Sequence, residues 1–119
     1  MQDCIFCKII NKEAEAGILF ENEESLAFTP LDAITNGHVL VVPKKHFENV
    51  FDIDEKTLAD LIVTAKKLAE AIVKEKGATG VNFLHASGKD AQQSVPHFHI
   101  HIVPRYPGDG LDLWLRNKL

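Results

Sequence analysis

Short apolar stretches alternate with polar ones along the chain, and their spacing predicts two helices and five strands. In residues 54–75 the apolar positions recur at steps of three and four, which is typical of a helix that packs one side on a sheet. Asp52 or Asp54 is expected to cap its start, and Gly77 stands where a helix-ending glycine belongs. In chain order we expect a helix at 4–11, strands at 18–21, 25–28 and 38–42, the long helix, and strands at 81–85 and 97–103.

This order of elements predicts an α+β fold with a mainly antiparallel sheet that is covered by helices on one face. Residues 38–42 are rich in β-branched side chains and are expected to form a buried strand that stops at Pro43. No repeat or low-complexity linker interrupts the sequence, so residues 1–119 are expected to form one domain. The stretch after Pro104 is irregular and carries the single tryptophan, Trp114.

Composition and charge narrow the class of protein. Apolar residues make up 45% and charged residues 25%, the balance of an ordinary soluble domain. The net charge of −4, with no basic block, argues against binding a nucleic acid duplex. No apolar run reaches the length of a membrane span, and the start of the chain lacks the pattern of a signal peptide. We therefore expect a cytoplasmic protein with no membrane partner, in which both cysteines stay thiols or bind metal.

Three histidines alternate with apolar residues in residues 97–103. In a strand, His97, His99 and His101 share one face while the residues between them enter the core. Alternate residues lie about 6.6 Å apart, so the outer two imidazoles are separated by about 13 Å. That spacing is wide for three ligands on one metal ion. It favours different roles for the three residues, in which two neighbouring histidines bind one phosphate and the third has another function.

Histidine chemistry suits phosphoryl transfer. An imidazole with a pKa of about 6.5 is largely neutral at physiological pH, and its phosphoryl adduct is easily hydrolysed. The preceding loop supports a phosphate site, because Gly88 permits a tight turn while Gln92, Gln93 and Ser94 offer hydrogen-bond donors. The alternative interpretation of this loop is a solvated polar segment.

Cys4 and Cys7 form a C-x-x-C pair, which on its own supplies at best half of a zinc site. His46 and His97 are available to complete it. A redox pair would need a βαβ setting that the predicted elements do not offer. The remaining alternative is two small residues that pack at a short helix.

The pattern His-φ-His-φ-His-φ-φ, with φ apolar, matches residues 97–103 completely, and the chain resembles the histidine triad family. The resemblance also covers IFCKII at 5–10, GHVLVVPKKH at 37–46 and QSV at 93–95. It is strongest with the Hint-like bacterial and archaeal branch. It implies a five-stranded antiparallel sheet with one long and one short helix, and a homodimer in which two sheets join into ten strands.

The resemblance also implies roles for particular residues. His99 would attack the α-phosphate and form a nucleotidyl-histidine intermediate, with His101 and the Ser94 hydroxyl holding the phosphate and His38 bordering the site. One structural zinc ion per chain would be bound by the positions that match Cys4, Cys7, His46 and His97. An AMP-type purine nucleotide would place its nucleoside in an apolar slot lined by Ile5, Phe6, Ile9 and Leu31.

The first functional hypothesis is hydrolysis of a purine nucleoside phosphoramidate that releases a nucleoside monophosphate. The alternatives are a dinucleoside polyphosphate hydrolase or nucleotidyl transferase, and a non-catalytic, zinc-stabilised nucleotide sensor. Three positions depart from the family pattern. Pro30 stands where many family members have a residue that contacts the ribose. Ala86 stands where the family has an Asn near the phosphate, and His85 and Ser87 beside it are possible substitutes. Gln92 stands where the family has a glycine.

Overall fold

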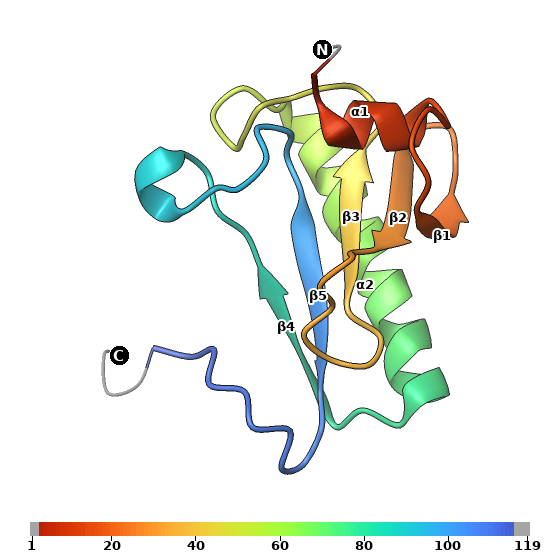
Figure 1. The fold of residues 1–119 in the computed structure, drawn as a ribbon, viewed down its shortest axis with the longest axis vertical. Helices are drawn as coiled ribbons and strands as arrows, with labels where there is room; N and C mark the ends of the chain where they lie inside the picture. The colour runs from red at the N-terminus through yellow and green to blue at the C-terminus, as the bar shows by residue number, and fades with distance from the viewer. Residues whose placement is uncertain (1–2, 116–119) are drawn as a thin grey trace.

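The computed structural model describes residues 3–115 and contains five strands and two α-helices, with one short 3-10 turn (Figure 1). The elements are α1 (Ile5–Ile10), β1 (Gly17–Glu21), β2 (Ser25–Thr29), β3 (Val39–Pro43), α2 (Glu55–Lys76), β4 (Gly80–Leu84), η1 (Lys89–Ala91) and β5 (Ile100–Arg105). Each predicted helix and strand is present, and outside β5 no bound differs from the expected one by more than one residue.

All five strands lie in one antiparallel sheet with the order β1-β2-β3-β5-β4. The connection through α2 places β5 between β3 and β4, so the C-terminal strand is central and β1 and β4 form the two edges. The predicted α+β class with a five-stranded antiparallel sheet is confirmed.

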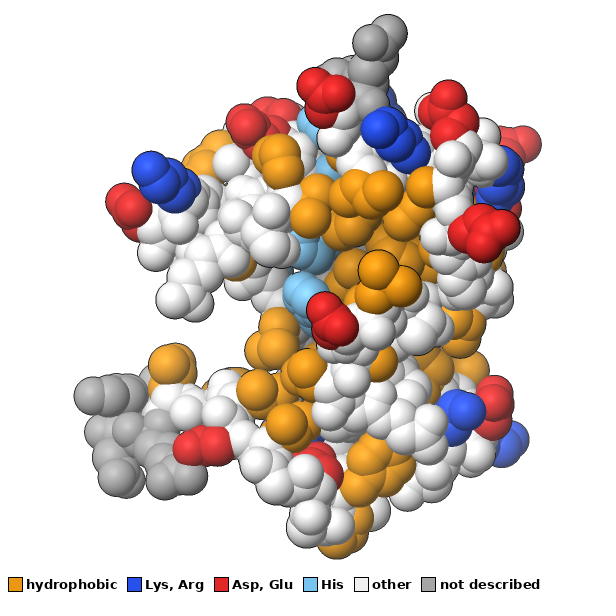
Figure 2. Space-filling model, in the orientation of Figure 1, with side chains coloured by type: hydrophobic (Ala, Val, Ile, Leu, Met, Phe, Trp, Pro, Cys, Tyr) orange, Lys and Arg blue, Asp and Glu red, His pale blue; other side chains and the backbone are white. Residues whose placement is uncertain are grey.

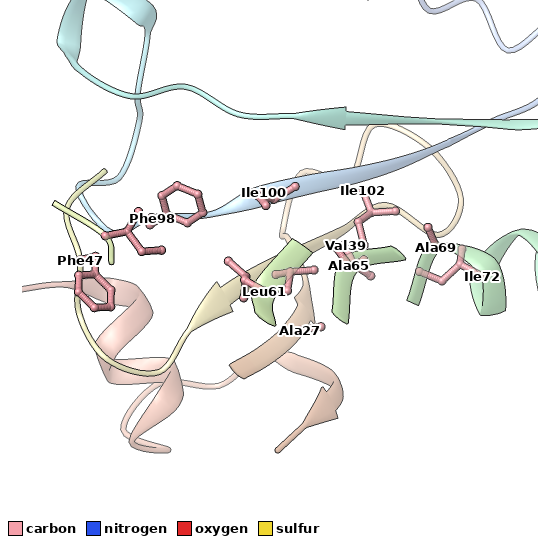
Figure 3. Close-up of a cluster of buried hydrophobic side chains, with 12 residues drawn as sticks. Ala27, Val39, Phe47, Leu61, Ala65, Ala69, Ile72, Phe98, Ile100 and Ile102 are labelled. Carbon is pink, nitrogen blue, oxygen red and sulfur yellow. The ribbon is translucent and has the colours of Figure 1, made fainter. Parts of the chain in front are cut away.

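Helix α2 forms as its capping residues predict. The Asp54 carboxylate accepts a hydrogen bond from the Thr57 backbone N–H at 3.0 Å, and Gly77 ends the helix with a left-handed φ of 74°. Its apolar side, with Leu61 and Ala65 among the buried residues, packs against the sheet beside Phe98 and Ile102 (Figure 3). Within residues 3–115 no helix is long and apolar enough to cross a bilayer.

The prediction that helices cover only one face of the sheet is wrong. Val39 and Val41 of β3 join the core under α2, whereas Leu40 and Val42 pack on the opposite face with α1. Every residue of β3 is buried, and a strand that is apolar on both faces has to be covered on both. The short helix α1 provides the second cover, and this places its N-terminus beside the segment that leads into β5.

Strand β5 begins three residues later than expected and runs through Pro104 to Arg105. The segment before it is held by other contacts, since the Phe98 N–H donates to the carbonyl of Phe47 at 2.7 Å. Pro104 fits inside the strand because it lies beyond Val39↔Ile102, the last pair between β3 and β5.

Candidate functional site

The histidines near the start of β5 form a connected group of rings with His38. The His99 and His101 ring centroids are 5.2 Å apart, and those of His38 and His101 are also 5.2 Å apart. Phe6 of α1 lies edge-on to both His97 and His99, so these two rings are on the α1 side of the sheet. Figure 2 shows histidine side chains along the border of an apolar surface patch.

The two ring nitrogens of His99 have distinct roles. Its Nδ1–H donates to the carbonyl of His97 at 2.8 Å, because a carbonyl oxygen only accepts. The Nε2 atom therefore carries the free lone pair. His99 is buried, with 5% of its surface exposed, and this desolvation lowers its pKa below the ordinary value for histidine. The ring is thus neutral at physiological pH, and the lone pair of Nε2 is not taken up by a proton.

His38 and His101 form a second hydrogen-bonded pair with fixed tautomers. The Ile34 N–H donates to Nδ1 of His38 at 3.1 Å, so the proton of His38 is on Nε2 and is donated to Nδ1 of His101 at 2.9 Å. This leaves His101 with its proton on Nε2, as a donor. Desolvation by burial lowers the pKa of His101 to about 4 and also lowers that of His38.

An open pocket of about 290 Å³ lies between β5 and the loop before it. Its polar lining comes from His85, Gln92, Ser94, His99 and His101. The volume is at the small end of ligand pockets and suits a phosphoryl group and its immediate substituents better than a whole nucleotide. Ala86 lines the same pocket, while Pro30 follows the end of β2 and is outside the lining.

The loop residues predicted to contact phosphate differ in whether their side chains are free to hydrogen-bond a ligand. The side-chain amide of Gln93 accepts from the Gly88 N–H at 2.7 Å and donates to the carbonyls of Glu48 and Val95. Gln93 therefore stabilises the loop through these hydrogen bonds, and its side chain has no donor left for a ligand. Ser94 is exposed and lines the pocket, so its hydroxyl is accessible.

Gln92 is one of two non-glycine residues with positive φ in residues 3–115, at φ 70°. This conformation costs a residue with a Cβ about 1 kcal/mol relative to glycine. We expect Gln92→Gly to raise the free energy of unfolding by about 1 kcal/mol in urea denaturation. Gln92→Ala removes the same side-chain amide but keeps the strained φ, and should give no gain. A lower stability for the glycine variant than for the alanine variant would contradict this explanation.

The four residues expected to form the nucleoside slot are not gathered around the pocket. Phe6 and Ile9 are buried in the core under α1, whereas Ile5 and Leu31 are exposed at the surface. Leu31 is fully exposed and borders a separate hollow of about 550 Å³ beside β1. Phe6 makes edge contacts with the rings of His99 and His97.

Cys4, Cys7, His46 and His97 come together from three separate parts of the chain, with their ligand atoms within 4.8 Å of one another. Sγ of Cys7 lies 3.4 Å from Nδ1 of His46 and 3.5 Å from Nδ1 of His97. Ligands at about 2.0–2.3 Å in a tetrahedron are about 3.3–3.8 Å apart, so this donor set fits zinc. Burial raises the pKa of the Cys7 thiol to about 11, and a bound cation would oppose this effect by stabilising the thiolate.

The surroundings of His97 suit a metal ligand. Its Nε2–H donates to the carbonyl of Pro43 at 2.8 Å, which fixes the tautomer and leaves Nδ1 free for the ion. His97 has no exposed surface, so the site is closed on this side. A closed Cys2His2 set is typical of structural zinc.

Comparisons with known proteins agree with the fold and the histidine pattern. A family model described as the HIT domain matches residues 11–108. The chain is 45% identical to an uncharacterized HIT-like protein of Methanocaldococcus jannaschii over 90% of this chain and 82% of that protein. It is 42% identical to the Bacillus subtilis protein named hit, over 92% of this chain and 76% of that one.

A solved structure carries the metal that the cysteine cluster suggests. It is the zinc-bound histidine triad family protein of Mycobacterium smegmatis, which is 34% identical, with 94% of this chain and 81% of that chain covered and a TM-score of 0.90. The match in sequence, fold and histidine pattern shows that this chain belongs to the HIT family of histidine triad proteins.

Proposed function

We propose that this protein is a nucleotide hydrolase or nucleotidyl transferase that acts at the α-phosphate through a nucleotidyl intermediate on His99. The observation that carries the proposal is the state of the His99 ring. Its Nδ1–H is donated to the His97 carbonyl, and the ring is neutral, desolvated and part of the 290 Å³ pocket. A neutral imidazole with one nitrogen engaged and the other free is the requirement for a histidine nucleophile.

The reaction takes two displacements at phosphorus. Nε2 of His99 forms a bond to the α-phosphorus while the bond to the leaving amine breaks, and the amine takes a proton from solvent. Water then attacks the same phosphorus and loses a proton to solvent, the bond to Nε2 breaks, and the nucleoside monophosphate leaves with the His99 ring restored. The Nε2–H of His101 and the Ser94 hydroxyl are suited to donate hydrogen bonds to the phosphoryl oxygens during both steps.

The charge of the pocket favours a phosphoramidate as substrate. Its lining contains histidines, a serine and a glutamine but no lysine or arginine among the described residues. A phosphoramidate presents a single negative charge, whereas a polyphosphate chain presents several and needs cations to hold it. We therefore rank AMP linked to an amine above a dinucleoside polyphosphate.

Parallel assays distinguish these substrates. Adenosine 5′-phosphoramidate and diadenosine tetraphosphate would be compared by kcat/KM for AMP release at the same enzyme concentration and ionic strength. We expect a preference of at least about tenfold for the phosphoramidate. A preference for the polyphosphate would keep the nucleophile and overturn the substrate choice. Nucleotide binding without turnover of either compound would replace the enzyme by a nucleotide sensor.

We also propose the homodimer with a ten-stranded sheet. The edge strand β4 supports it, because Val81 and Phe83 each leave 39% of their surface exposed beside unpaired backbone groups. Trp114 is 63% exposed in the C-terminal tail and is a candidate to contact the partner's site. Sedimentation at micromolar concentration should give the dimer mass, and Phe83→Lys should shift it to the monomer. A monomeric wild type would contradict the dimer.

A further inference from the structure

The carbonyl of His99 lies where the sheet does not provide it with a partner. The β4–β5 ladder stops at the pair Leu84↔His101, and the β3–β5 ladder stops at Val41↔Ile100. His99 itself is buried, and a buried carbonyl without a donor is costly. The backbone of the proposed nucleophile therefore needs an anchor from outside the ladders.

A side chain provides that anchor. Nδ1 of His85, the residue after the end of β4, lies 2.8 Å from the carbonyl oxygen of His99. Because the carbonyl only accepts, Nδ1 of His85 carries the proton and donates it. The imidazole thus adds one hydrogen bond beyond the last backbone pair of β4 and β5.

Ser87 fixes the tautomer of His85. The Val50 N–H donates to Oγ of Ser87 at 2.9 Å, so the hydroxyl proton is free to be donated to Nε2 of His85, with which Oγ is also hydrogen-bonded. Both nitrogens of His85 are then engaged within the protein. Although His85 lines the pocket, neither nitrogen is free to bind a substrate.

The ring of His85 is also held by packing. It lies against Phe98 with centroids 4.5 Å apart and an interplanar angle of 32°. Phe98 is 2% exposed and its N–H donates to the Phe47 carbonyl at 2.7 Å. His85 consequently contacts the side chain of Phe98 and the backbone carbonyl of His99, the residue after Phe98.

We infer that His85, with its tautomer set by Ser87, is a positioning residue that fixes the backbone of His99 and thereby aims the His99 ring at the phosphorus. This inference rests on the proposed function. In this chain His85 lies next to Ala86, which cannot donate a side-chain hydrogen bond, so the imidazole supplies a polar anchor that the neighbouring position lacks.

The test compares variants that separate the hydrogen bond donated by His85 to the His99 carbonyl from the packing of its ring against Phe98. His85→Phe keeps a ring against Phe98 but has no donor, and we expect kcat for adenosine 5′-phosphoramidate to fall about tenfold with KM within about twofold, since a displaced nucleophile slows the chemical step. His85→Asn places an amide donor near the position of Nδ1 and should restore most of that loss. Ser87→Ala removes the hydroxyl that fixes the tautomer of His85, and it should give an intermediate kcat.

Leu68→Ala in the middle of α2 is the control for general destabilisation. Leu68 is partly buried against the core and far along the chain from His85, so its truncation should lower the melting temperature and leave kcat unchanged. An unchanged kcat in His85→Phe would overturn the inference. So would an equal loss in His85→Phe and His85→Asn, because packing alone would then explain the effect.

A spectroscopic measurement separates this inference from the proposed function. In protein labelled with ¹⁵N-histidine, the wild type should show His85 protonated on Nδ1, and His85→Phe should broaden or shift the His99 ring signals. If the wild type turns over neither adenosine 5′-phosphoramidate nor diadenosine tetraphosphate, the proposed function fails, and the His99 ring signals decide the inference alone. Unaltered His99 signals in His85→Phe would then overturn it.

Discussion

Replacing His99 by alanine is expected to lower turnover of the better nucleotide substrate by at least about 10³-fold, because the variant lacks the free Nε2 lone pair that the proposed reaction uses. The other two histidines of the triad have different roles. His101 presents a proton on Nε2, and His97 points its free Nδ1 at the cysteine cluster. Neither can replace the lone pair on Nε2 of His99.

The measurement is kcat/KM for AMP release by wild type, His99→Ala and His99→Gln. Gln keeps a polar side chain of similar reach but cannot form a stable phosphoryl adduct, so both variants should lose activity equally. The zinc content and circular dichroism of each variant should match the wild type, which shows that folding is intact. Activity within about tenfold of wild type in either variant would remove His99 from the chemical step.

Removal of zinc is expected to have the largest effect on stability. Four ligands from the start of α1, the loop after β3 and the segment before β5 converge within 4.8 Å, so the ion would tie together three separate parts of the chain. Loss of a structural metal site of this kind costs at least about 3 kcal/mol of folding free energy. Protein purified without chelator should contain about one zinc ion per chain.

The experiment follows the melting temperature with and without a strong chelator, in wild type and Cys4→Ser. The chelator should lower the midpoint of the wild type by more than about 10 °C and leave the variant, already lacking the ion, unchanged. Chelator saturated with zinc is the control. Absence of zinc, with both thiols freely titratable, would contradict the site.

Zinc loss should also reduce turnover, through a single residue. The His97 side chain would bind the ion while its carbonyl accepts the Nδ1–H of His99 at 2.8 Å. Displacement of His97 would therefore remove this hydrogen bond, and the His99 ring would no longer be held in the tautomer that carries its proton on Nδ1. The proposed metal site and the proposed nucleophile would thus be coupled through His97.

Local signals made much of this fold predictable from the sequence. The helix α2 combines a 3.6-residue apolar period with a capping Asp54 and a terminal Gly77, and all three features agree in the structure. The alternation of residues 97–103 indicated a strand whose polar side chains lie together. It did not indicate that Phe98 would bind the backbone of Phe47 and delay the start of β5, because that contact joins distant parts of the chain.

The environments of individual side chains depend on long-range contacts that the sequence does not show. Nothing in the spacing of Phe6 and Leu31 reveals that one packs into the core under α1 and the other lies fully exposed. The hydrogen bond from His85 to the His99 carbonyl crosses from the end of β4 to the start of β5, and it follows only from the register of those strands. The grouping of Cys4 and Cys7 with His46 and His97 was more predictable, since the C-x-x-C pair supplies half of a zinc site and the family resemblance implies the two histidines.

Trapping the intermediate tests the central proposal most directly. Wild-type protein mixed with excess adenosine 5′-phosphoramidate would be quenched within milliseconds under alkaline conditions, which preserve phosphoryl-histidine bonds, and the peptide containing residues 97–105 examined by mass spectrometry. We predict an added AMP group on His99 that disappears as AMP is released, at a rate matching turnover. Turnover with no adduct on His99 at any time, or with the adduct on another residue, would contradict the account.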